Sequence, residues 1–310
     1  MSYRYLHKLT ESELPPTALA IGVFDGVHRG HQALLVAAGE AAAEFAAVPA
    51  ALTFDPHPSA IFAPARTPLL LGTLSERAAL LHRYGISEVV VAHFDRAFAA
   101  QTPDAFISEV LLHRLRVRAV IVGDDFRFGC DRTGNVALLK SAGERHGFAV
   151  RVMAPVFVEG TPARSTAIRH LLAGGKVAEA EALLGRPYTL SGTVVRGRQL
   201  GRTIGFPTAN LQTAPGILIP AAGVYAGYAH LSSGERVRTA ISIGTNPTVT
   251  PHATERTVEA FLMDDFSRDL YHHSLTLEFA AYLRPTLKFD SLDTLVAQMH
   301  QDVALARQLL

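Results

Sequence analysis

The sequence is poor in cysteine, in net charge and in long hydrophobic runs. Its 310 residues include one cysteine, Cys130, which excludes an internal disulfide and argues against a cysteine-based zinc site. The 29 Lys and Arg residues nearly balance the 28 Asp and Glu residues, so overall charge favours neither nucleic acid nor an anionic membrane as a partner. No run reaches the roughly 20 apolar residues that span a bilayer, and the N-terminus has no apolar targeting core. We therefore expect a cytoplasmic protein that acts on small molecules; the oligomeric state stays open.

The chain does contain enough apolar material for two hydrophobic cores. Hydrophobic residues make up 48% of it, and its length suggests roughly two domains. The hydrophobic pattern changes near Gly185, which predicts a first domain over residues 1–185 and a second over 186–310.

Short apolar runs alternate with segments of helical period in the first domain. The runs read ALAIGVF, PAALTF, EVVVAHF, AVIVG and FAVRVM. The helices between them have recognisable starts, including a capping box from Thr73 to Glu76 and Thr102 followed by Pro103. Strands that are apolar throughout are typical of a parallel sheet covered on both faces. We therefore expect a Rossmann-like α/β domain that binds ligands at the carboxyl ends of its strands.

The second domain has a different period. Five or six short segments alternate β-branched with polar or small residues, among them YTLSGTVVRG, GVYAGYAHL and LTLEFAAYL. Glycine and proline separate them, which favours a small antiparallel barrel. The last segment, 291–310, returns to helical spacing, with an apolar stripe that should pack on the barrel. Its residues are Leu292, Leu295, Val296, Met299 and Val303.

The loop after the first apolar run, GVFDGVHRGH, places His28 and His31 beside Gly26 and Gly30. Glycine permits close approach of the backbone, and the N-terminus of the following helix attracts anions, so the loop suits a nucleotide phosphate. Two imidazoles there can stabilise charge on a phosphate under attack. The alternative is a zinc site completed by Asp55 or His57, although the helical metalloprotease pattern is absent.

Further motifs follow the loop. GVFDGVHRGH resembles the H-x-G-H signature of nucleotidyltransferases. TFDPHP, VGDDFRFG and STAIR, which begin at residues 53, 122 and 165, are similar to other site motifs of the FAD synthetase half of bacterial bifunctional riboflavin kinase/FAD synthetases. In the second domain, GRTIGFPTANL resembles the riboflavin kinase signature, and PAAGVYAG, SIGTNPTV and VEAFLMDDFSRDLY follow it. The resemblance covers nearly the whole chain and implies an α/β nucleotidyltransferase domain followed by a small antiparallel β-barrel with a C-terminal helix.

The resemblance implies two reactions that share ATP as co-substrate and require Mg²⁺. Riboflavin and ATP give FMN and ADP, and FMN and ATP then give FAD and pyrophosphate. The FMN phosphate is already anionic near neutral pH, so its transfer needs charge stabilisation more than a strong base. The ribityl hydroxyl is poorly ionised, so its phosphorylation needs a general base.

For the first domain, the resemblance implies that His28, His31 and Arg169 are catalytic. The imidazoles would hold the α-phosphate, and Arg169 would hold the departing pyrophosphate with two hydroxyl groups. Asp55 and His57 are expected to bind the flavin. The residues expected to contact ATP or its phosphates are Gly22, Phe24, Asp25, Gly30, Asp125, Arg127, Ser165 and Thr166. For Phe126 and Phe128, a buried aromatic loop is the alternative to a ligand contact.

For the second domain, the resemblance makes Glu259 the general base. Thr208 and Asn210 would bind ATP with Gly201 and supply oxygen ligands for Mg²⁺, and Arg284 would bind the flavin. The plainer alternatives are a solvated strand glutamate and an ordinary turn at 207–210. No P-loop motif is present.

The chain departs from the family pattern at several positions. His272 stands where the family usually has glycine, which puts the geometry of the kinase loop in question. Arg164 replaces a serine before STAIR, where it would contact phosphate or face solvent. Two alternative functions follow: an adenylyltransferase with weak or absent kinase activity, and a non-catalytic flavin-binding sensor.

Overall fold

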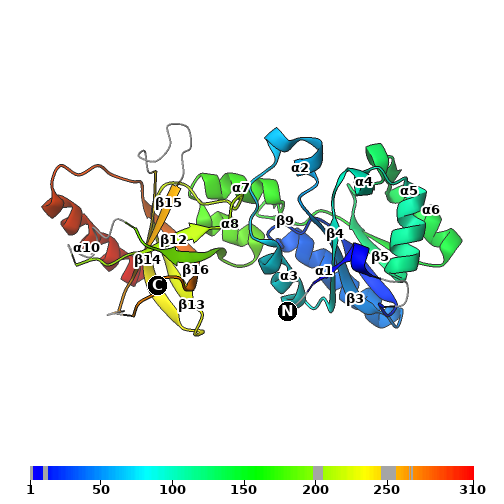
Figure 1. Cartoon of the computed structure of the whole chain (residues 1–310), viewed down its shortest axis with the longest axis horizontal. Coiled ribbons are helices and arrows are strands. Elements are labelled where there is room, and N and C mark those ends of the chain that lie inside the picture. The colour runs from blue at the N-terminus through cyan, green and yellow to red at the C-terminus, as the bar shows by residue number, and fades with distance from the viewer. Residues whose placement is uncertain (1–2, 10–12, 198–204, 246–255, 265, 267) are drawn as a thin grey trace. The chain divides into compact units, whose positions relative to one another are not determined.

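A computed structural model describes residues 3–9, 13–197, 205–245, 256–264, 266 and 268–310. The chain divides into two compact units, Met1–Ser165 and Thr166–Leu310 (Figure 1). The division falls after the first residue of α7 (Ser165–Ala173), so the rest of α7 and all of α8 (Val177–Leu184) belong to the second unit. The sequence pattern assigns both helices to the first domain, and the boundary near Gly185 stays a prediction. Gly201 lies outside the described residues.

Within the described residues, the first unit is built on a six-stranded parallel sheet with the order β1-β4-β3-β2-β5-β8. The five predicted apolar runs are all strands, and the short edge strand β1 was not predicted. The order reverses at β2, which pairs with both β3 and β5, so the loops after β2 and β5 flank the switch point where such sheets bind ligands. The strands are β1 (Arg4–Tyr5), β2 (Thr17–Ile21), β3 (Val48–Asp55), β4 (Glu88–His93), β5 (Val117–Gly123) and β8 (Ala149–Met153).

Helices cover both faces of this sheet. Strand β2 turns Ala18 and Ala20 toward α1 (Arg29–Glu44) and α3 (Leu74–Arg83), and these small residues let the alanine-rich α1 pack closely. It turns Leu19 and Ile21 toward the opposite core, formed with the π-helix η3 (Phe106–Arg114) and α6 (Val136–His146). The predicted capping box at Thr73 and the cap at Thr102 are both confirmed.

Shorter elements complete the first unit. They are η1 (Leu6–Lys8), α2 (Ser59–Phe62), η2 (Pro64–Arg66), α4 (Arg96–Ala99), α5 (Pro103–Ala105), η4 (Cys130–Arg132), and the two strand pairs β6 (Arg127–Phe128) with β7 (Gly134–Asn135) and β9 (Phe157–Val158) with β10 (Thr161–Pro162).

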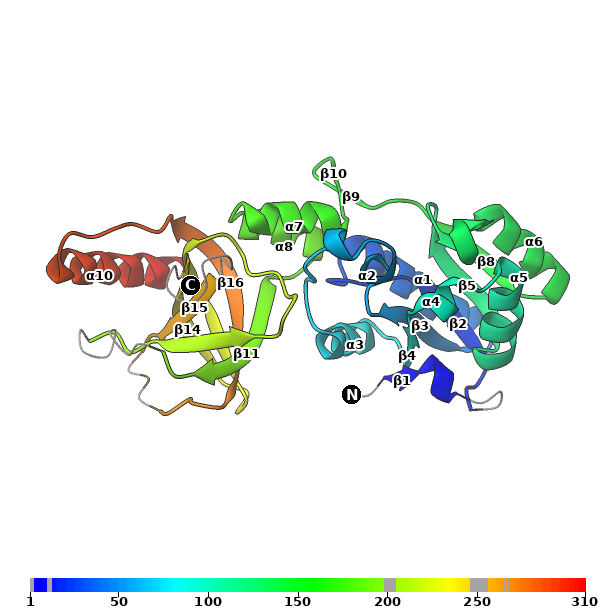
Figure 2. The same ribbon diagram turned by 45° about the horizontal axis from the view of Figure 1, so that its top comes forward.

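In the second unit, six antiparallel strands within the described residues close into a barrel with the order β11-β12-β15-β14-β13-β16, as predicted. Helix α10 (Leu292–Leu309) lies beside the barrel (Figure 2). Val296, Met299 and Val303 of the predicted stripe pack on the barrel core. Leu292 was predicted to join them but is 51% exposed, because it occupies the first position of the helix and is not part of that core. The strands are β11 (Tyr188–Val195), β12 (Ala209–Thr213), β13 (Gly223–Leu231), β14 (Arg236–Thr245), β15 (Arg256–Leu262) and β16 (Ser274–Arg284).

Candidate active sites

The histidine loop joins β2 to α1 at the switch point of the sheet. His28 is the N-cap of α1, and its Nδ1 accepts a hydrogen bond from the backbone N–H of His31 at 3.3 Å. The two imidazoles stack with ring centroids 3.6 Å apart, and the ring of Phe24 meets His31 edge-on at 5.1 Å. His28 is only 6% exposed. The loop therefore holds the imidazoles in one rigid pair.

The backbone of this loop is strained and tied down from several directions. Val27 has φ +41°, a conformation that a β-branched residue adopts only when its surroundings impose it. Its carbonyl accepts a hydrogen bond from Nε2 of Gln32 at 2.9 Å. Oδ1 of Asp25 accepts one from the N–H of Leu71, and the Asp25 carbonyl accepts one from Oγ of Ser165, each at 2.9 Å. Asp25 and Ser165 thus anchor the loop.

The charge state of His31 follows from its surroundings. Burial, then His28, then the guanidinium of Arg77 lower the pKa of His31 well below its usual value of 6.5. The imidazole is therefore neutral at pH 7, with one N–H to donate. Its Nδ1 is buried and has no hydrogen-bond partner among the described residues.

Arg77 is a buried cation beneath the loop that was not predicted as a site residue. Its Nη1 donates to Oγ1 of Thr53 at 3.2 Å and to the carbonyl of Phe54 at 3.0 Å. Oγ1 of Thr53 donates in turn to the carbonyl of Val23 at 2.8 Å. Burial lowers the pKa of Arg77, and Asp25 and Asp55 act in the opposite direction. Arg77 therefore links β3 to the histidine loop and supplies positive charge near His31.

A cavity of about 840 Å³ opens beside the loop in the first unit; we call it the aromatic cavity. It is lined by five predicted site residues, namely Gly22, His31, His57, Asp125 and Arg127. Nδ1 of His57 accepts a hydrogen bond from the N–H of Ser59 at 3.1 Å. The exposed Asp125 lies 4.0 Å from Nη2 of Arg164, which gives Arg164 a carboxylate partner at the cavity mouth.

Phenylalanines form most of the apolar wall of this cavity. Phe126 and Phe128 stack with ring centroids 5.5 Å apart. Phe128 contacts Phe106, which contacts Phe98, and further edge-on and tilted contacts link these rings to the others. A wall of aromatic faces and edges suits a planar, conjugated ligand. The seven rings are Phe54, Phe62, Phe94, Phe98, Phe106, Phe126 and Phe128.

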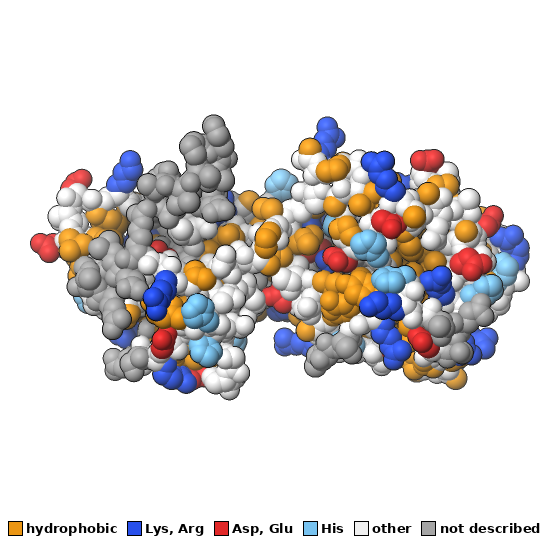
Figure 3. Space-filling model, in the orientation of Figure 1, with side chains coloured by type: hydrophobic (Ala, Val, Ile, Leu, Met, Phe, Trp, Pro, Cys, Tyr) orange, Lys and Arg blue, Asp and Glu red, His pale blue; other side chains and the backbone are white. Residues whose placement is uncertain are grey.

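The surface around this unit carries charge of both signs. On the face seen in Figure 3, lysine, arginine, aspartate, glutamate and hydrophobic side chains are interspersed. This mixture is consistent with the nearly balanced composition. In the part of the chain that the structure describes, no helix combines the length and apolar character needed to cross a membrane.

The second unit has its own cavity of about 390 Å³ between the barrel and α10; we call it the barrel cavity. The four described residues that were predicted for this half all line it. They are Thr208, Asn210, Glu259 and Arg284. Its apolar wall combines aromatic and aliphatic side chains, chiefly Phe206, Phe261, Leu287, Phe289, Leu295 and Met299.

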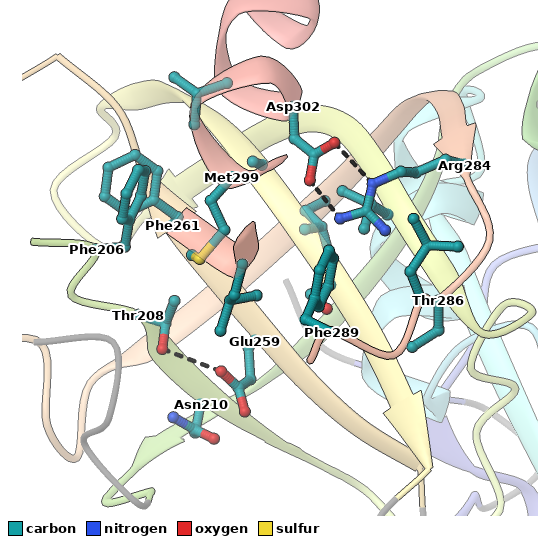
Figure 4. A pocket seen from close by; sticks show the side chains of 17 residues that line it. Phe206, Thr208, Asn210, Glu259, Phe261, Arg284, Thr286, Phe289, Met299 and Asp302 are labelled. Carbon is teal, nitrogen blue, oxygen red and sulfur yellow. Dashed lines mark hydrogen bonds and ion pairs between the residues drawn. The ribbon is translucent and has the colours of Figure 1, made fainter. Parts of the chain in front are cut away.

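Three oxygen-bearing side chains meet at one end of the barrel cavity (Figure 4). Oγ1 of Thr208 donates to Oε2 of Glu259 at 3.1 Å, and Asn210 pairs directly with Glu259 across β12 and β15. A Cβ at Gly197 would lie 2.3–2.6 Å from the side-chain amide of Asn210, so a larger residue at that position would have to displace this amide. Hydroxyl, amide and carboxylate oxygens are the donors that Mg²⁺ prefers, and this set fits the ion. Among the described residues, no three His, Cys, Asp or Glu side chains gather in a metal-binding arrangement.

Arg284 has a structural partner on α10. Its Nε and Nη2 donate to Oδ1 and Oδ2 of Asp302 at 2.8 and 2.6 Å, a bidentate pair seen on the far side of the cavity from Glu259 in Figure 4. Nε2 of Gln298 donates to the same carboxylate at 3.0 Å. Arg284 thus fastens α10 over the barrel while it lines the cavity.

Comparison with known proteins matches both halves of the chain. The family model described as FAD synthetase matches residues 10–167, and the one described as riboflavin kinase matches residues 184–310. The bifunctional riboflavin kinase/FMN adenylyltransferase of Escherichia coli K12 is 40% identical over 306 residues, which cover 98% of this chain and 96% of that protein. The protein of the same name from Haemophilus influenzae is 39% identical and covers 94% of this chain and 93% of its own.

The chain belongs to the bifunctional riboflavin kinase/FMN adenylyltransferase family. The resemblance stated from the motifs is thereby confirmed, and so is the predicted fold. Among solved structures, the macrolide-efflux protein from Streptococcus pneumoniae is 31% identical, with a TM-score of 0.86 over 97% of this chain and 96% of that one.

The other predicted residues that the structure describes do not line either cavity. Phe24, Asp25, His28, Gly30 and Ser165 form the packed support of the histidine loop. Asp55 ends β3, where its carbonyl accepts a hydrogen bond from the N–H of Phe94 at 2.9 Å. Thr166 and Arg169 lie in α7, on the helix that Ser165 begins.

Two groups of site residues escaped the sequence analysis. Arg77 occupies the apolar stripe of α3 with Ala78 and Leu81, and a charge in that position was a usable indication of a buried role. Phe62, Phe94 and Phe98 follow two different strands, and their convergence is visible only in the folded unit.

Proposed function

We propose that the two activities are housed separately, with FMN adenylyltransferase chemistry in the first unit and riboflavin kinase chemistry in the barrel. The observation that carries the proposal is that each unit has its own cavity, and each cavity is lined by a different set of reaction-suited groups. The first cavity pairs a neutral histidine with an aromatic wall. The second pairs a carboxylate with neutral oxygen ligands and an apolar wall.

In the first unit, the FMN phosphate attacks the α-phosphorus of ATP, a new P–O–P bond forms and pyrophosphate leaves. The neutral imidazole of His31 donates its N–H to a non-bridging α-phosphate oxygen, where charge accumulates. His28 fixes the ring by stacking and by capping α1, whose N-terminus adds a favourable dipole. The phenylalanine wall holds the isoalloxazine ring. Since Ser165 already donates to the loop backbone, its role is support.

In the barrel, the 5′-hydroxyl of riboflavin gives its proton to Glu259 and attacks the γ-phosphorus of ATP, and ADP leaves. Thr208 donates a hydrogen bond to Oε2 of Glu259, so we assign acceptance of the proton to Oε1. Thr208 and Asn210 would hold Mg²⁺, which neutralises phosphate charge when bound. Phe206, Phe261 and Phe289 would pack on the isoalloxazine ring.

The geometry around His272 supports an active kinase. His272 has φ +66°, the region that glycine would enter freely and that histidine enters more readily than most residues. Its N–H donates to the carbonyl of Val194 at 2.8 Å, and Val194 donates back to the carbonyl of His273 at 3.0 Å. The turn is therefore held against β11 with histidine in place.

Two variants test the separation of sites. His31→Ala should abolish formation of FAD from supplied FMN while FMN formation from riboflavin stays near wild type. Glu259→Ala should do the reverse, and the conservative Glu259→Gln should behave like it because an amide cannot accept the proton. Chromatography of the flavin products measures both steps in one reaction. Equal loss of both activities in either variant would contradict the proposal.

A further inference from the structure

Gln101 forms part of the wall of the aromatic cavity, between α4 and α5. Its backbone is fixed on both sides: its N–H donates to the carbonyl of Phe98 at 3.3 Å, and its carbonyl accepts from the N–H of Cys130 at 2.7 Å. Its side-chain Oε1, in contrast, is buried and has no hydrogen-bond partner among the described residues. The loop therefore presents an unsatisfied carboxamide at a fixed place.

Such an atom needs a physical reason. A buried acceptor without a partner forfeits the hydrogen bonds that water gives the unfolded chain, and native proteins satisfy nearly all such groups. Three side-chain atoms in the described part of the chain are unsatisfied, and two of them, Oε1 of Gln101 and Nδ1 of His31, belong to residues that line the same cavity. The neighbouring Phe98 and Phe106 offer no conventional hydrogen bond. The missing partner is therefore expected from a ligand.

The chemistry of that ligand follows from the proposed function, on which this inference rests. The isoalloxazine ring of FMN is apolar along one edge and carries an imide at the other, with N3–H between two carbonyl groups. A carboxamide complements an imide, since it can accept from N3–H and donate to an adjacent carbonyl in either orientation. We propose that Gln101 forms hydrogen bonds with the imide edge of FMN. Adenylyl transfer would thereby be specific for flavins that carry a free N3–H.

A third cavity, of about 410 Å³, also borders Gln101, and we call it the polar cavity. A polar group in this cavity is the competing explanation for the unsatisfied Oε1 atom. Its polar lining consists of His7, His93, Asp95, Glu109 and Arg114 in addition to Gln101. Asp95 accepts from the N–H of Phe98 at 2.7 Å, and Arg114 donates to the carbonyl of Leu6 at 3.3 Å. None of these groups donates to Oε1 of Gln101. The aromatic cavity is the larger of the two and contains the planar wall that the flavin ring requires.

The test compares FMN with N3-methyl-FMN in the full-length enzyme, for wild type, Gln101→Leu and Gln101→Met. Wild type should prefer FMN by about 100-fold or more in kcat/KM, because the methyl group removes the donor that a built polar site demands. In both variants this preference should shrink to about threefold. Their KM for FMN should rise about 10- to 100-fold, with kcat changed much less, because the imide lies at the opposite end of FMN from the reacting phosphate.

Matched controls separate the possible failures. Glu109→Gln changes a residue that lines the polar cavity and not the aromatic cavity, so this variant should keep the wild-type preference for FMN over N3-methyl-FMN. Riboflavin kinase activity should be unchanged in every variant. If Gln101→Leu retains the preference for FMN, or if Glu109→Gln loses it, recognition by Gln101 is refuted while the adenylyltransferase assignment stands. If wild type itself fails to convert FMN to FAD, the proposed function fails first.

Discussion

Replacing Gly30 by alanine tests how closely the histidine loop is packed. Gly30 lies in the first turn of α1, where a Cβ would come within 2.9 Å of the Ala163 carbonyl oxygen and 3.1 Å of Cε1 of His28. The first contact is with backbone, which cannot rotate away. Alanine therefore has to displace the segment at Ala163, the ring of His28, or both.

The expected magnitude is a balance of two terms. Alanine is favoured over glycine within a helix by about 1 kcal/mol, whereas forcing an extra methyl group into a packed site costs about 1–3 kcal/mol. Gly39, on the exposed side of the same helix, provides the matched control because a Cβ there meets nothing within 4 Å. The free energies of unfolding of Gly30→Ala and Gly39→Ala should thus differ by about 1–3 kcal/mol, with Gly39→Ala the more stable.

The decisive assay is FAD formation from supplied FMN, with thermal unfolding recorded for both variants. A shift of the imidazole pair by about 1 Å should slow adenylyl transfer about 100-fold in Gly30→Ala. Gly39→Ala should remain fully active, and FMN formation from riboflavin should be normal in both. If the two variants have equal stability and equal FAD formation, the close packing of His28 does not position the catalytic pair.

The other predictions concern a buried ion pair and the charge of His31. Asp302→Asn leaves the Arg284 guanidinium, whose side chain is 17% exposed, without its charged partner. It should cost about 2–4 kcal/mol of barrel stability and weaken FMN formation. Asp264→Asn disrupts the more exposed pair with Arg238 and should destabilise the barrel much less. Equal destabilisation in thermal unfolding would contradict a fastening role for Arg284. Because the pKa of His31 lies well below 6.5, raising the pH from 7 to 8.5 removes no proton from it, so kcat/KM for adenylyl transfer should stay within about threefold. A tenfold fall per pH unit in a pH–rate profile would instead identify an imidazolium donor.

The strands and helices of the first unit were predictable because each carries its own local pattern. The apolar runs became β2, β3, β4, β5 and β8, and the cap residues mark the starts of helices independently of tertiary contacts. Strand β1 was missed because two residues, Arg4 and Tyr5, have no periodicity, and only parallel pairing with Val90 and Val91 makes them a strand.

Candidate site residues could be named from the sequence where they fall within short motifs. Spacing together with the family resemblance indicates His28 and His31, and the resemblance alone indicates Thr208, Asn210 and Glu259; their roles stay predictions. The wall of phenylalanines was not predictable, because Phe62 follows β3 whereas Phe94 and Phe98 follow β4, and these rings converge only when the parallel strands bring their carboxyl ends together. The pairing of Arg284 with Asp302 depends in the same way on how α10 docks, which no local pattern encodes.

The most direct test of the account is a time course of purified protein with riboflavin, ATP and Mg²⁺, in which FMN, FAD, ADP and pyrophosphate are resolved chromatographically. FMN should appear first and then give way to FAD, with one ADP released per FMN formed and one pyrophosphate per FAD. Persistence of riboflavin while added FMN becomes FAD would contradict the kinase assignment of the barrel. Flavin binding with no turnover of either substrate would contradict both assignments.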